Sequence, residues 1–205
     1  MGLTNAQLRE HLDAVAAQDP LVAAALERCG YPQERIRPTG YHTLLRTIVG
    51  QQVSVAAAAS VWRKLEAELG VDMPAQELLA RDFDTLRACG LSRQKQGYAR
   101  SLCELVASGE LRFDQLPGDD EQAIAELTRI KGIGRWSAEI YLLFAEGRQD
   151  IWPAGDLAVQ EAVGRLLELP ARPNEKDTRA LGEKWRPWRG AMAIFTWHTY
   201  NNAAL

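Results

Sequence analysis

Two glycines on either side of one isoleucine constrain this chain more than any other feature of its sequence. Glu121–Arg129 carries apolar residues at helical spacing before them, and Trp136–Ala145 does the same after them. Gly132 and Gly134 lack a Cβ, so the backbone can take a positive φ there and reverse direction without a clash. We therefore predict two helices joined by a tight hairpin at about residues 121–145.

The same hairpin has the features of a phosphate-binding site. Backbone N–H groups at the start of its second helix have no helical acceptor, and the helix dipole favours an anion there. The predicted site comprises Lys131, Gly132, Ile133, Gly134 and Arg135. We also expect a side chain at Gly134 to strain the turn and crowd the phosphate. An ordinary glycine-capped turn between two helices explains the local sequence equally well.

The rest of the chain predicts an all-α fold, because helical patterns recur and strand signals are almost absent. Thr4 and Gln7 form a capping-box pattern, Pro20 is placed to begin a helix, and Gly30 is placed to end it. The other expected helices are Tyr41–Leu69, Pro74–Ala80, Asp82–Cys89, Ser92–Ser108, Asp156–Leu167, Asn174–Trp185 and Pro187–Asn201.

Two of these segments carry more specific predictions. Within the helix predicted from Tyr41 to Leu69, Val53 is expected in the buried stripe, and Ala56–Ala59 are expected to allow close helix packing. The segment Leu86–Arg93 faintly repeats the hairpin pattern. It is either a second, degenerate hairpin that touches DNA or a plain helix end followed by a helix start, and we expect the latter.

Composition limits the classes of function. The chain has 205 residues, 46% of them hydrophobic, which suffices for one large domain or two small lobes. Its net charge of −3 means that any nucleic-acid binding must depend on local groups. The three cysteines and three histidines show no metal-ligand or disulfide spacing. No apolar run approaches the ~20 residues of a membrane span, and no signal-peptide pattern opens the chain, so we expect a cytoplasmic protein.

Several strings resemble known DNA repair enzymes. Leu127–Ala138 reads Leu-x-x-Ile-x-Gly-Ile-Gly-x-Trp-x-Ala, and Trp152–Leu157 follows at a matching separation. Together they resemble the hairpin and the aspartate loop of the helix-hairpin-helix DNA glycosylase superfamily. Ile48–Ala58 and Trp185–Arg189 resemble segments of the 3-methyladenine DNA glycosylase II family. The match runs from about Tyr41 to the end, and the chain resembles the short, all-helical members.

This resemblance implies a single glycosylase domain over residues 1–205, with two helical lobes and the active-site cleft between them. It implies a monofunctional enzyme of base excision repair that flips alkylated bases, such as 3-methyladenine, out of double-stranded DNA and hydrolyses the N-glycosidic bond. We expect a monomer that requires no cofactor and no membrane, associated with the nucleoid if the source is bacterial. The alternative is a non-catalytic helix-hairpin-helix scaffold that binds DNA, which would need neither a catalytic carboxylate nor an aromatic pocket.

Asp156 has two compatible interpretations. Its position before a predicted helix favours an N-cap carboxylate. The resemblance instead implies a catalytic carboxylate, which stabilises the positive charge that develops on the sugar as the base departs. Trp136 stands where bifunctional relatives carry a nucleophilic lysine, and an indole cannot form a Schiff base. This substitution predicts an enzyme that leaves the abasic strand intact.

Aromatic residues are candidates for the base pocket. The resemblance places Trp136, Tyr141 and Trp197 there, because an electron-rich ring attracts a cationic alkylated purine. Packing in the core is the simpler role for such residues. Ile140 stands at a pocket position that is normally aromatic, which leaves the base preference open.

Two further features follow from the resemblance. Gln52 takes the position of the wedge that fills the hole left by the flipped base; the simpler interpretation is a polar residue on an exposed helix face. The backbone carbonyls of Thr128, Ile130 and Ile133 match those that hold a monovalent cation, Na⁺ or K⁺, against a DNA phosphate. Ordinary capping of the helix by water is the alternative.

Overall fold

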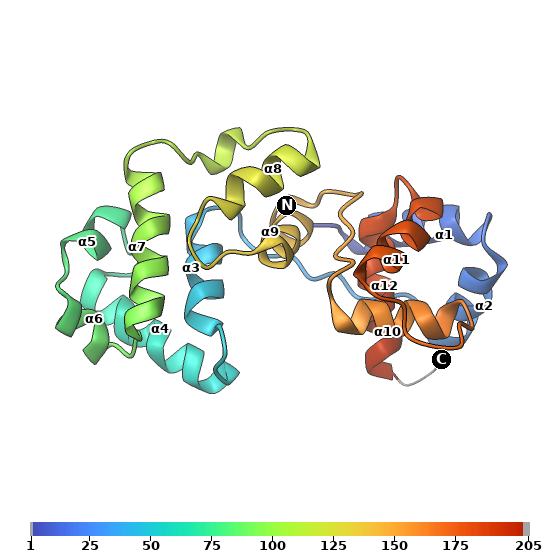
Figure 1. Cartoon of the computed structure of the whole chain (residues 1–205), viewed down its shortest axis with the longest axis horizontal. Helices are drawn as coiled ribbons and strands as arrows, with labels where there is room; N and C mark the ends of the chain where they lie inside the picture. Colours follow the sequence, from blue (N-terminus) through green and yellow to red (C-terminus); the bar gives the residue numbers. More distant parts are fainter. Residues whose placement is uncertain (1, 203–205) are drawn as a thin grey trace. The chain divides into compact units, whose positions relative to one another are not determined.

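The computed structural model describes residues 2–202, which form two compact units (Figure 1). The central unit is Pro38–Ala138, and the terminal unit comprises the described residues up to Arg37 and from Glu139 onward. Residues 2–202 contain helices and turns but no β-strand, so the predicted all-α class is confirmed. The cleft expected between two lobes stays a prediction.

The central unit is assembled around helix α7 (Arg93–Ala107). Its elements are α3 (Tyr41–Gly50), α4 (Val55–Leu69), α5 (Ala75–Ala80), α6 (Phe83–Ala88), α7 (Arg93–Ala107), the 3₁₀ turn η1 (Phe113–Gln115), α8 (Asp120–Thr128) and the start of α9 (Arg135–Tyr141). Helix α7 packs against α3 and α5, and α3 packs against α4 (Figure 1). Leu44, Ile48 and Leu102 are completely buried and belong to this core.

The single helix predicted from Tyr41 to Leu69 is wrong. The chain leaves the helical conformation at Gln51 and begins a new helix after Ser54, whose Oγ accepts the N–H of Ala57 at 3.2 Å. Val53 therefore lies in the turn and is 44% exposed instead of buried. Ala56, Ala57 and Ala59 are also exposed, so these small residues do not serve helix packing. The cap at Ser54 explains why the chain breaks there.

The terminal unit is formed from both ends of the described chain. It contains α1 (Asn5–Ala16), α2 (Pro20–Cys29), the end of α9, the π-helical turn η2 (Leu142–Glu146), α10 (Leu157–Leu166), α11 (Glu175–Gly182), the 3₁₀ turn η3 (Glu183–Trp185) and α12 (Arg189–Asn202). Helix α10 packs against α12, and α1 packs against α2 and α12 (Figure 1).

The predicted helix caps of this unit are confirmed. Thr4 and Gln7 form the capping box at the start of α1, and Gly30 ends α2 with a φ of +67°. Pro20 occupies the first turn of α2 behind the cap residue Asp19. Among residues 2–202, no helix has both the length and the apolar character needed to cross a bilayer.

Candidate functional site

The predicted hairpin is present, and its two glycines play different roles. Gly132 has a φ of +82°, and a Cβ built on it would lie 2.2 Å from Cδ2 of Tyr98, so only glycine fits there. Ile133 is 3% exposed, as expected of a residue that fills the turn. Gly134 has no positive φ, and a Cβ there would meet no atom within 4 Å. The expected strain at Gly134 is therefore wrong, and this position instead leaves open space at the start of α9.

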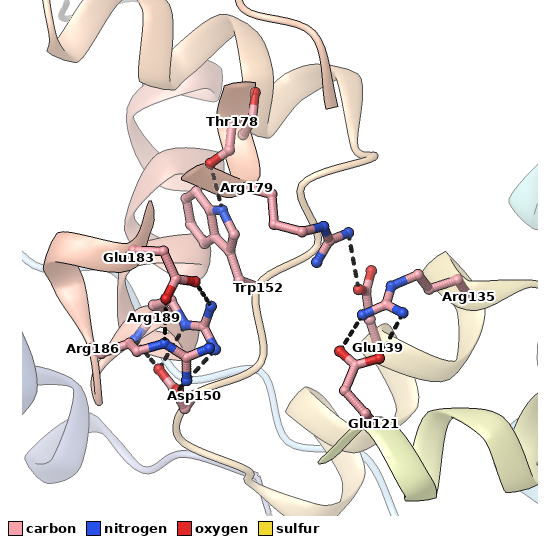
Figure 2. Close-up of polar contacts among 10 residues, drawn as sticks. All are labelled: Glu121, Arg135, Glu139, Asp150, Trp152, Thr178, Arg179, Glu183, Arg186 and Arg189. Carbon is pink, nitrogen blue, oxygen red and sulfur yellow. Dashed lines mark hydrogen bonds and ion pairs between the residues drawn. The ribbon is translucent and has the colours of Figure 1, made fainter. Parts of the chain in front are cut away.

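Of the two basic residues of the predicted phosphate site, one is exposed and one is ion-paired. Lys131 is exposed, and its backbone N–H donates to Oγ of Ser101 at 3.1 Å. The guanidinium of Arg135 contacts both carboxylate oxygens of Glu121, with Nη1 at 2.8 Å from Oε2 (Figure 2). A phosphate that recruits Arg135 must therefore compete with this exposed ion pair, which contributes little stability.

The carbonyls predicted to hold a cation lie in the same turn. The carbonyl of Ile130 accepts the N–H of Ile133 at 3.0 Å, which leaves its second lone pair for another partner. Carbonyl oxygens suit a hard cation such as Na⁺ or K⁺, so the donor set fits. Across residues 2–202, no group of three or more His, Cys, Asp or Glu side chains could hold a metal ion.

Gln52 lies in the turn between α3 and α4, so the alternative of an exposed helix face is wrong. Its φ is +54°, which is uncommon for a residue with a side chain, and the residue is exposed. The preceding Gln51 donates from Nε2 to the carbonyl of Gly132 at 2.8 Å. The structure thus brings the predicted wedge and the predicted phosphate site together within the central unit.

The segment that faintly repeats the hairpin also packs beside this turn. Gly90 has a φ of +103° after α6, and Ser92 caps α7 by accepting the N–H of Lys95 at 3.3 Å. A helix end is followed by a helix start, as expected, and the contact of this segment with DNA stays a hypothesis. Gly90, Ser92 and Lys95 line a cavity of about 460 Å³ that Gln52 and Gly132 also border.

Asp156 is the N-cap of α10, as its position in the sequence predicts. Its Oδ1 accepts the backbone N–H groups of Ala158 at 2.9 Å and Val159 at 3.0 Å. The same oxygen accepts Nε1 of Trp197 at 3.1 Å, from the middle of α12. Three donors therefore hold a half-buried carboxylate in one orientation.

A second set of contacts fixes the loop before Asp156. Gln160, buried on α10, donates from Nε2 to the carbonyl of Ala154 at 2.8 Å. Trp152 donates from Nε1 to the carbonyl of Thr178 at 2.9 Å (Figure 2). Its ring meets that of Trp185 edge-on, with centroids 5.4 Å apart. Sequence reasoning missed Gln160 and Thr178, because an isolated polar residue in an apolar helix gives no sign of its partner.

An ion-pair network anchors the start of that loop. Asp150 contacts Arg186 and accepts Nε and Nη2 of Arg189 at 2.8 Å each (Figure 2). Glu183 contacts the same two arginines, with Nη1 of Arg189 at 2.7 Å from its Oε1. Arg189 is 7% exposed, so most of its charge is satisfied by these two carboxylates. The network joins the loop to η3 and the start of α12.

The three predicted pocket aromatics differ in exposure. Trp197 is half-buried, with its ring 5.6 Å from that of Phe144. Tyr141 is buried, with 1% of its surface exposed. Trp136 is 46% exposed, so core packing does not account for it. Trp197 contacts Asp156 through its Nε1–H, at 3.1 Å from Oδ1.

Known proteins resemble this chain in sequence and in fold. The family model for HhH-GPD superfamily base excision DNA repair proteins matches residues 45–187. DNA-3-methyladenine glycosylase 1 of Schizosaccharomyces pombe is 32% identical over 163 residues, which are 78% of this chain and 72% of that protein.

Solved structures show the same fold. A DNA-3-methyladenine glycosidase of Bacillus halodurans superposes with a TM-score of 0.87 at 29% identity, covering 95% of this chain and 90% of its own. The S. pombe 3-methyladenine DNA glycosylase Mag1, solved in complex with abasic DNA, superposes with a TM-score of 0.79 at 28% identity, covering 96% and 98%. The match of the family model over most of the chain, together with these relatives, shows that the protein belongs to the HhH-GPD superfamily of base excision DNA repair proteins.

Proposed function

We propose that this protein is a monofunctional DNA glycosylase that removes alkylated bases, such as 3-methyladenine, from double-stranded DNA. The observation that carries the proposal is the carboxylate of Asp156, held by two backbone N–H groups and the indole N–H of Trp197. A DNA-binding scaffold has no need of a carboxylate oriented against an aromatic ring. The relatives named as 3-methyladenine glycosylases support the substrate class.

In the proposed reaction, water replaces the base at C1′ of the flipped nucleotide. The bond between C1′ and the base nitrogen breaks first, its electrons leave with the base, and positive charge develops on the sugar. Asp156 stabilises that charge and orients the attacking water, which loses its proton to bulk solvent as the new C–O bond forms. An N-alkylated purine is already a good leaving group, so strong acid catalysis is unnecessary.

The remaining groups serve binding. Trp197, Tyr141 and Trp136 provide ring faces for the flipped purine, and Gln52 fills the space left in the duplex. The hairpin binds a phosphate through the amides of its turn. A Na⁺ or K⁺ at the carbonyls of Thr128, Ile130 and Ile133 would strengthen that contact, and catalysis requires no other cofactor. We further propose that the protein is a monomer and acts in the cytoplasm.

Incubation with methylated genomic DNA tests this function directly. Released bases are separated by chromatography, and the proposal predicts free 3-methyladenine that increases with time and enzyme concentration. A binding scaffold would retain the DNA in a gel-shift assay and release no base. That pair of results would replace the proposed function with the scaffold alternative.

A further inference from the structure

A single side chain ties the turn that carries Gln52 to the hairpin. Nε2 of Gln51 lies 2.8 Å from the carbonyl oxygen of Gly132, although 81 positions separate the two residues in the chain. Gly132 cannot shift easily, because its backbone has a positive φ and packs against the ring of Tyr98. The carbonyl that Gln51 binds is therefore a fixed point of the hairpin.

Helix α7 supports both partners of this contact. Nζ of Lys95 donates to the carbonyl of Val49, in the last turn of α3, at 2.7 Å. One turn further, Tyr98 lies against Gly132, and Ser101 accepts the backbone N–H of Lys131 at 3.1 Å. The end of α3 and the hairpin are thus held to the same helix, and Gln51 bridges them directly.

The conformation of Gln52 requires such support. A left-handed backbone conformation is unfavourable for a residue with a side chain. Conformations of this kind persist only where the surroundings enforce them. Two contacts hold the backbone just before Gln52 in place. Lys95 binds the carbonyl of Val49, and Gln51 binds the carbonyl of Gly132. These contacts lie beside the cavity of about 460 Å³, which is bordered by Gln51, Gln52, Lys95 and Gly132.

We propose that Gln51 is a positioning residue that couples phosphate binding at the hairpin to the insertion of Gln52 into the duplex. The proposal rests on the proposed function. Once the hairpin amides hold a phosphate, the carbonyl of Gly132 is fixed relative to the DNA. Through its hydrogen bond, Gln51 holds the turn at a fixed position relative to that carbonyl. The adjacent Gln52 therefore enters the duplex at a set depth.

The test compares three variants with the wild type. Gln51→Met keeps the length of the side chain and removes its N–H donor, and Gln52→Ala gives the signal expected when insertion is lost. Gln18→Met is the matched control, because Gln18 also donates from Nε2 to a backbone carbonyl, that of Ala14 at 3.4 Å, but lies in the terminal unit. Single-turnover base release is measured on one methylated strand, alone and in duplex. The fluorescence of 2-aminopurine opposite an abasic-site analogue reports insertion without any reaction.

For Gln51→Met, we expect the ratio of duplex to single-strand rates to fall about fivefold, the effect of one typical hydrogen bond. Its fluorescence should move toward the value for Gln52→Ala, while Gln18→Met matches the wild type in both measurements. The inference is overturned if Gln51→Met keeps the wild-type ratio and fluorescence. It is also overturned if both substrates slow equally and the melting temperature drops, since that pattern indicates a structural role. If the wild type releases no base, the proposed function fails and the fluorescence alone decides the role of Gln51.

Discussion

At the residue scale, the orientation of Asp156 depends on three N–H donors that converge on one of its oxygens. Two come from the backbone of α10, where only proline would remove an N–H. The third is the indole N–H of Trp197, so this residue has two separable functions in the proposed mechanism. Its ring faces the base, and its N–H holds the carboxylate.

Trp197→Phe separates these functions, because phenylalanine keeps an aromatic face and lacks the N–H. A hydrogen bond to a charged group typically contributes about 1.5–3 kcal/mol, so we expect single-turnover base release to slow by roughly tenfold or more. Affinity for an abasic-site duplex should change little. Trp152→Phe removes a different indole N–H, which binds the carbonyl of Thr178, and should lower stability more than rate. Equal rates for wild type and Trp197→Phe would show that the N–H has no catalytic importance.

His11 gives the fold a pH dependence. It is 3% exposed, its ring stacks on Trp188 with centroids 4.1 Å apart, and its Nδ1 has no hydrogen-bond partner. Burial lowers the pKa of His11 below its ordinary value of 6.5, and the nearby Glu10 partly opposes this shift. Below pH 6.5 the unfolded chain therefore takes up a proton that the folded chain resists. Stability should fall with pH in that window and level off below the folded-state pKa.

Urea unfolding of His11→Leu at pH 7 and pH 5 measures this effect, because leucine is neutral at both. The variant should lose less stability than the wild type between the two pH values. Other titrating groups are common to both proteins and cancel in the comparison. An identical loss in the two proteins would mean that His11 is protonated as easily in the folded state as in the unfolded state.

At the scale of elements, the two glycines of the hairpin differ in their surroundings: Gly132 packs against a side chain, and Gly134 faces open space. Gly132→Ala forces a positive φ on alanine and drives its Cβ into Tyr98, which together should cost about 3 kcal/mol of unfolding free energy. Gly134→Ala meets no atom and should leave stability close to wild type. Urea unfolding of the two variants tests this contrast. Equal destabilisation of both would contradict the difference that the structure shows.

Gly134→Asp then tests the phosphate site without disturbing the fold. The added carboxylate repels a phosphate at the start of α9, so affinity for duplex DNA should fall and wild-type binding should weaken with added salt. Gly134→Ala serves as the neutral control. If Gly134→Asp binds as tightly as Gly134→Ala across a salt titration, no phosphate lies at this turn.

Sequence reasoning predicted the elements that local chemistry controls. The caps at Thr4 and Asp156 and the glycine hairpin depend on residues within four positions of each other, and all three are present. The break between α3 and α4 was missed because Val53 and the alanines that follow continue an apolar helical pattern. The pattern did not reveal that Ser54 would cap a new helix.

Contacts between distant segments could not be predicted from the sequence for a different reason. Gln51 meets Gly132, and Trp197 meets Asp156 across 41 positions, only after the helices have packed. The resemblance supplied candidate roles for Gln52, Asp156 and Trp197, whereas the structure supplied the side chains that hold them.

At the scale of the whole molecule, the proposed chemistry predicts a product with an intact strand. Trp136 offers no amine at the position where bifunctional relatives carry lysine, so no Schiff base with the sugar should form. A duplex with one methylated purine should therefore break only after alkali treatment, on a denaturing gel. Strand breaks without alkali, or a protein–DNA adduct trapped by borohydride, would show lyase activity.

The most direct test of the account is single-turnover base release by Asp156→Asn. Asparagine keeps the shape of the side chain and can still accept the N–H groups that begin α10, so circular dichroism and melting temperature should stay close to wild type. The variant loses the negative charge that stabilises the sugar cation, and base release should fall by roughly 10²–10³-fold while binding to an abasic-site duplex persists. A folded variant that releases methylated bases at the wild-type rate would contradict the catalytic role of Asp156, and an unfolded variant would show that this residue is chiefly a structural cap.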